Sequence, residues 1–206
     1  MWKQYWPVYE RLEREFRELT FSISLDDANL EVFSMYLAEL VLRIGQECEN
    51  ASKSLAKELG LSPTSRAIEK LNFPELGKLL CASVPLNTKT VEVRWIYQSL
   101  ANKLLSPFSS WSSGTTSTNP AWYDAYNGLK HDRNANFRKA TYRNALEGLA
   151  GLFILNLWLR KTEIETKGEW VELAKERITS YSELFDPSSF LQLGRGSTRR
   201  SLRLVI

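Results

Sequence analysis

Apolar residues recur at steps of three and four in three segments of the chain, a spacing that places them on one face of an α-helix. The first segment, residues 8–19, is rich in charge and predicts an amphipathic helix. The second, residues 31–59, predicts a long core helix that ends at Gly60. The third, residues 136–160, predicts another core helix with a wide apolar face. That face comprises Ala140, Ala145, Leu146, Leu149, Ala150, Phe153, Ile154, Leu157 and Trp158.

Shorter helices are predicted between and after these segments, at residues 62–71, 76–81, 122–130 and 170–180. Pro63 and Pro74 lie at first-turn positions, where a missing N–H costs the helix nothing. Asn119 followed by Pro120 is a helix-start signal, with the asparagine as the expected cap. Together these patterns predict an all-α fold, a helical bundle built on two long core helices.

Three other stretches depart from the helical pattern. Residues 90–97 alternate apolar and polar side chains, which predicts a strand or an extended arm. Residues 106–120 form a loop rich in Ser, Thr, Gly and Pro. The end of the chain, residues 190–193 and 202–206, predicts either a short hairpin or an arm that pairs with another chain. We therefore expect one bundle domain over residues 1–186 and an appended arm over residues 187–206.

Composition changes this picture little. At 206 residues, with 43% hydrophobic and 25% charged residues, the chain has the make-up of one ordinary globular domain. The net charge of +3 is too small to indicate a nucleic-acid partner. Its distribution is more informative, because the terminal arm contains no Asp or Glu. The arm is basic through Arg195, Arg199, Arg200 and Arg203. Contact with a polyanion and simple solvation both stay open for it.

The cysteines and the apolar runs bound the cellular setting. Cys48 and Cys81 have the spacing of neither a disulfide framework nor a zinc site. The most apolar stretch, residues 149–159, is about half as long as a bilayer crossing requires. No amino-terminal signal is recognised, so we expect a cytoplasmic protein with no membrane partner. No metal and no cofactor is expected.

The chemistry that stands out surrounds His131, the one histidine of the chain. Imidazole is the side chain best suited to proton transfer near neutral pH. Within a helix, Tyr123, Asn127 and His131 are successive i, i+4 neighbours on one face. Lys130 and Arg133 flank the imidazole. A sole histidine among cations and an amide is typical of a site for an anion such as RNA phosphate.

Metal-free RNA cleavage needs proton transfer to and from oxygen and stabilisation of the phosphorane. His131 is the candidate proton-transfer residue, and Asn127 is expected to orient phosphate or imidazole. Lys130 or Arg133 supplies charge, and a bend after His131 brings Arg138 near. One histidine per chain fills only one of the two proton-transfer roles. A symmetric homodimer, which presents each residue twice, fills both.

A structural interpretation stays open beside the catalytic one. A histidine at a helix end is commonly a cap that bonds the last carbonyl groups. Trp122, Tyr123 and Tyr126 are expected in the core or an interface rather than as base-stacking platforms. Glu47 has two interpretations as well. In the first it forms a surface ion pair with Arg43, and in the second one acid of the segment 43–49 faces the motif helix and holds His131 or Arg133 in place.

The run Trp-Tyr-Asp-Ala-Tyr-Asn-Gly-Leu-Lys-His-Asp-Arg at 122–133, followed by Asn-Ala-Leu-Glu-Gly-Leu-Ala-Gly-Leu-Phe, resembles bacterial helical proteins of the HEPN superfamily. The resemblance covers residues 31–59 and 120–160. It implies an all-α, often dimeric bundle, with many members acting as metal-independent RNases in toxin–antitoxin, abortive-infection or CRISPR systems.

The family motif has an arginine, then a polar residue, then a histidine. Asn127 and His131 match the last two, whereas Tyr126 occupies the arginine position. This departure removes the cation that the family places on the phosphate. Tyr126, Arg138 and Glu47 are the residues expected to contact substrate.

Two functions follow as hypotheses. The first is a HEPN-like RNA-binding domain or metal-independent endoribonuclease that uses His131, with RNA and a cognate antitoxin or regulatory protein as partners. The second is a non-catalytic interaction or dimerisation module of the same fold, in which the motif only supports the bundle. Tyr126 in place of arginine favours the second, and the polar residues at 127–134 favour the first.

Overall fold

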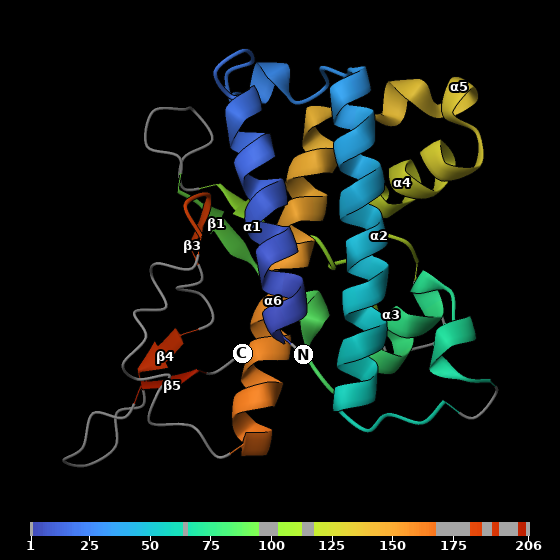
Figure 1. Cartoon of the computed structure of the whole chain (residues 1–206), viewed down its shortest axis with the longest axis vertical. Helices are drawn as coiled ribbons and strands as arrows, with labels where there is room; N and C mark the ends of the chain where they lie inside the picture. Colours follow the sequence, from blue (N-terminus) through green and yellow to red (C-terminus); the bar gives the residue numbers. More distant parts are fainter. Residues whose placement is uncertain are drawn as a thin grey trace.

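The computed structural model describes residues 2–63, 66–94, 103–112, 118–167, 182–186, 191–193 and 202–204. They form a mostly helical fold with a small antiparallel sheet (Figure 1). The α-helices are α1 (Trp2–Leu19), α2 (Met35–Glu58), α3 (Phe73–Cys81), α4 (Ala121–His131), α5 (Arg133–Asn136) and α6 (Tyr142–Lys167). Short 3₁₀ helices are η1 (Asp27–Asn29), η2 (Ile68–Lys70), η3 (Leu86–Thr88) and η4 (Phe137–Lys139). The strands are β1 (Val91–Val93), β2 (Leu104–Leu105), β3 (Phe185–Asp186), β4 (Leu191–Leu193) and β5 (Leu202–Leu204).

Helix α6 lies between α1 and α2 and packs most extensively on α2 (Figure 1). Every residue of its predicted apolar face is buried, and Leu152, Leu155 and Leu159 on other sides are buried as well. A helix that is apolar all round is one that protein covers on all sides. Aromatic pairs join it to α1, with Tyr9 and Phe153 at 5.4 Å between ring centroids. The bundle therefore closes around α6.

Both ends of α2 follow from local chemistry. Ser34 caps its first turn by accepting a hydrogen bond from the Leu37 N–H at 3.1 Å. The start is later than predicted because residues 32–33 pair with the start of α6, with Phe33 bridged to Thr141 and the Val32 carbonyl bonded by the Tyr142 N–H. The other end confirms the prediction at Gly60, whose φ of +64° suits glycine.

The chain between α4 and α6 differs from the predicted single core helix over 136–160. Two short elements, α5 and η4, precede α6, which begins at Tyr142. Asp132 caps α5 by accepting from the Ala135 N–H at 3.1 Å, and Asn144 donates to the Lys139 carbonyl at 2.9 Å. These local bonds stop helix propagation before Tyr142.

Other predicted elements change in detail. Residues 62–71 contain only η2 among the described positions, not a full helix. Helix α3 begins with a capping box between Asn72 and Glu75. Asn119 does not cap α4. Its side chain donates to the Asp124 carboxylate at 2.7 Å instead. The predicted helix at 170–180 lies outside the described residues.

The sheet has the order β2-β1-β3, with Glu92 opposite Leu104 on one side and Asp186 on the other. The prediction of an all-α fold omits it, although the alternation at 90–97 predicted a strand there. Val91 and Val93 are buried, which is why the strand stays in the core instead of extending as an arm. Residues 95–97 lie outside the described part.

Little of the basic carboxy-terminal arm, residues 187–206, is described. Within it, β4 and β5 pair antiparallel, with Leu191 opposite Leu204. This pairing agrees with the hairpin alternative. The side chains of the four arginines that make the arm basic lie outside the described part. Among the helices of the described part, none is long and apolar enough to cross a membrane.

A buried carboxylate attaches β3 to α1. Glu13 of α1 accepts hydrogen bonds from the Ser182 hydroxyl and from the Leu184 N–H, the latter at 2.8 Å. The Tyr9 hydroxyl donates to Ser182 Oγ at 3.0 Å. Burial raises the pKa of Glu13, while its hydrogen bonds and the charge of Arg17 lower it. The net shift is upward.

This shift predicts a pH dependence of stability. Because the folded state holds the Glu13 proton more tightly than the unfolded state, the free energy of unfolding falls as pH rises above the ordinary glutamate pKa of 4.5. Glu13→Gln keeps the acceptor oxygen and removes the titration, so its thermal melting point is expected to fall less between pH 4.5 and pH 8. Glu10→Gln, on the exposed side of the same helix, is the matched control. If wild type and Glu13→Gln show the same dependence of melting point on pH, Glu13 is not the group that causes it.

Candidate functional site

The end of α4 is fixed by a tight turn into α5. The Asp132 N–H bonds the Gly128 carbonyl at 2.9 Å, and the Asn136 amide donates to the Asp132 carbonyl at 2.9 Å. A Cβ at Gly128 would lie 2.8 Å from Asn136 Cγ, so glycine lets Asn136 fold back onto α4. Asp132 also caps α5. The turn therefore holds residues 128–136 as one unit.

His131 is the last residue of α4 and is exposed. It makes no side-chain hydrogen bond or ion pair with any described residue. The capping role that the sequence allowed for it is carried by the Asp132 N–H, which bonds the Gly128 carbonyl of α4. Asn127 lies one turn earlier on the same helix and is half-buried. His131 is thus exposed to solvent, and Asn127 lies one turn before it on α4.

Tyr126, at the position of the family arginine, is a core residue with 2% of its surface exposed. Its ring lies directly on Gly45 of α2, where a Cβ would be 2.2 Å from Tyr126 Cγ. Because the ring is enclosed by α2, the substrate contact expected of Tyr126 has no ring face available to it. Trp122 and Tyr123 are buried as well, as predicted.

Lys130 is held by two partners and is not a free cation. Its Nζ donates to the Tyr126 hydroxyl at 3.1 Å and lies 3.8 Å from Glu49 Oε2. The hydrogen bond with Tyr126 raises the pKa of Lys130, and the charge of Glu49 adds to this against the opposing effect of burial. The sequence offered Lys130 or Arg133 as the residue that supplies charge to a phosphate. Of the two, Arg133 is the one that forms no ion pair with a described residue.

Glu49 is the acid of the segment 43–49 that faces the motif helix, whereas Glu47 was the acid expected at the site. It accepts a hydrogen bond from the Tyr123 hydroxyl. Burial first, and then the bond and charge of Glu49, raise the pKa of Tyr123 far above that of a free tyrosine. Glu49 lies one helical turn from Gly45, where α4 meets α2. That glycine was the signal in the sequence that could have found it.

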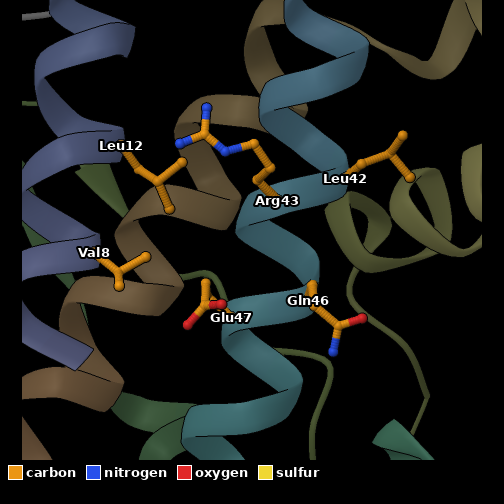
Figure 2. Close-up of a pocket in the computed structure, with 6 residues that line it drawn as sticks. All are labelled: Val8, Leu12, Leu42, Arg43, Gln46 and Glu47. Carbon is orange, nitrogen blue, oxygen red and sulfur yellow. The ribbon is translucent and has the colours of Figure 1, made fainter. Parts of the chain in front are cut away.

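Glu47, which was expected to contact substrate, lies on a different side of α2 from the one that meets α4. With Val8, Leu12, Leu42, Arg43 and Gln46, it lines a pocket of about 250 Å³. Figure 2 shows Arg43 and Glu47 on the side of α2 toward α1, from which Val8 and Leu12 project. The expected hold on His131 or Arg133 is therefore wrong for Glu47. The expected Arg43–Glu47 ion pair is wrong too, because Arg43 pairs with Glu15 of α1.

Cationic side chains gather along the chain from the end of α4 through α5 and η4. We call residues 130–139 the cationic segment, and its exposed cations outside Lys130 are Arg133, Arg138 and Lys139. Helices α4, α5 and η4 all contact one another. The one carboxylate of the segment, Asp132, is used as the cap of α5. Arg133, Arg138 and Lys139 form no ion pair with any described residue.

Comparisons with protein-family models, curated proteins and solved structures found no match to this chain. Within the described ranges, no group of three His, Cys, Asp or Glu side chains is arranged to hold a metal ion.

Proposed function

We propose that this protein binds RNA through the cationic segment, as an RNA-binding domain of the HEPN-like kind that its motif resembles. The proposal is supported by three cationic side chains whose charges no described carboxylate neutralises. Arg133, Arg138 and Lys139 are exposed and form no ion pair within the described ranges, while the single carboxylate among them is used as a helix cap. Arginine and lysine side chains in this state bind phosphates through charge and release of counterions.

In this proposal α2 and α6 are the two core helices of a bundle that supports the cationic segment. Helix α4 packs on both of them, and the turn at Asp132 fixes α5 to α4. The cationic segment is thus carried on a rigid support, so its backbone loses little freedom when RNA binds.

Cleavage of the bound RNA is a second candidate function. Its support is His131, which is exposed, bonds no described side chain and has Asn127 one turn away on the same helix. One histidine cannot both accept and donate a proton in a single step. A homodimer that brings two copies of His131 to one phosphate supplies both groups, and an antitoxin or regulatory protein belongs to this same candidate.

One experiment separates the two functions. A labelled RNA oligonucleotide is incubated with purified protein and EDTA, and binding and product ends are both measured. We expect a complex without cleavage, because Tyr126 removes the motif cation. Cleavage that leaves cyclic phosphate ends, and that disappears in His131→Ala with an unchanged melting point, would establish the second candidate. RNA that is neither bound nor cut would refute both and leave the interaction-module hypothesis.

A further inference from the structure

Phe33 is an aromatic residue at the edge of the cationic segment with 40% of its surface exposed. Its backbone forms an antiparallel bridge with Thr141, and the neighbouring Tyr142 N–H bonds the Val32 carbonyl at 2.9 Å. Ser34, the next residue, is fixed as the cap of α2. The backbone that carries the Phe33 ring is therefore fixed by the pairing with α6 and by the cap of α2.

The ring of Phe33 also has ordered neighbours. Phe137 meets it edge to face, with the ring centroids 5.5 Å apart and the planes at 88°. The guanidinium of Arg138 lies over the ring, 5.8 Å from its centroid. Such a ring, part exposed and with a planar cation beside it, presents a flat surface for stacking.

The charges around Phe33 favour an anionic ligand. Arg138 and Lys139 carry no ion pair with a described residue. The nearest acid along the chain, Glu31, is bound to Arg143 of α6, with Arg143 Nε and Glu31 Oε1 2.7 Å apart. The surface thus combines an apolar ring with positive charge that is not neutralised by the described residues, as single-stranded nucleic-acid sites do.

We infer that Phe33, with Arg138, is a stacking platform for an unpaired nucleobase, and that Arg133 and Lys139 bind the phosphates on either side. This inference rests on the proposed RNA-binding function and adds the class of nucleic acid, a single strand. In a duplex the faces of the bases are covered by their neighbours, so only an unpaired base can lie on the ring. RNA and DNA single strands share this chemistry.

The test uses Phe33→Leu, which keeps apolar volume and removes the aromatic face. Affinities are measured by fluorescence anisotropy for a short single-stranded RNA, the same sequence as DNA, and a duplex RNA of equal length. We expect wild type to prefer single strands and Phe33→Leu to lose at least about fivefold on them, with duplex affinity unchanged. Phe21→Leu is the matched control, because Phe21 is 91% exposed and lies outside the cationic segment.

The outcomes distinguish this inference from the function on which it rests. If Phe33→Leu binds single strands as wild type does, while reversing the charges of Arg133, Arg138 and Lys139 removes binding, the stacking platform is refuted and RNA binding stands. If no oligonucleotide binds, both fail. Binding to vesicles of phosphatidylserine that depends on Phe33, without binding to any oligonucleotide, would overturn the inference in favour of a lipid surface. Equal affinity for DNA and RNA single strands supports it.

Discussion

Replacing Arg133, Arg138 and Lys139 together with glutamate is expected to lower the affinity for RNA at least about a hundredfold at physiological salt. Each of these cations is exposed, and the change breaks no ion pair within the described part of the fold. The slope of log affinity against log salt is expected to become less negative by about 2, since each single-strand phosphate that the variant no longer neutralises contributes about 0.7. Anisotropy titrations over a range of salt concentrations measure both quantities.

The matched control reverses three exposed cations elsewhere, Arg14 of α1 with Lys70 and Lys78 near α3. Its change of net charge is the same, so any general effect of charge appears in both variants. The control is expected to keep most of the affinity of wild type. Equal reductions in the two variants would show that RNA responds to total charge alone and that the cationic segment has no special role.

Tyr126→Arg restores the arginine of the family motif and is expected to unfold the protein instead of activating it. The Tyr126 ring is buried on Gly45, so the substitution removes core packing and places a charge where a ring was. We expect a loss of about 3–5 kcal/mol in the free energy of unfolding, measured by urea denaturation. Ribonuclease activity is not expected to appear.

Tyr126→Phe is the control for this prediction. It keeps the ring and removes only the hydroxyl that accepts from Lys130, so it is expected to cost about 1 kcal/mol. A Tyr126→Arg protein that is as stable as wild type and cuts RNA would show that this position faces substrate, contrary to the packing on α2.

Much of the helical architecture could be predicted because apolar spacing reports burial directly. The apolar face of α6 and the end of α2 at Gly60 are examples. The late start of α2 could not be predicted, because it depends on pairing between Phe33 and Thr141, which are far apart in sequence. The sheet was missed for a similar reason, since a short strand gains its stability from partners elsewhere in the chain.

The sequence predicted which segment carries the site, but it did not predict which residues of other helices contact that segment. The motif placed Asn127 and His131 on one helix, as the structure also does. Which acid of α2 meets that helix depends on the rotation of two packed helices, and Glu49 rather than Glu47 proved to face it. Phe33 and Arg138 are far apart in the chain, so only the fold brings ring and cation together.

The central claim, that RNA lies on the cationic segment, is tested most directly by photocrosslinking. A single-stranded RNA containing 4-thiouridine is crosslinked to the protein, and mass spectrometry locates the modified peptides. We expect crosslinks within residues 130–139 and at Phe33. Crosslinks confined to the basic arm, residues 187–206, or to the pocket beside Glu47, with none in the cationic segment, would contradict it.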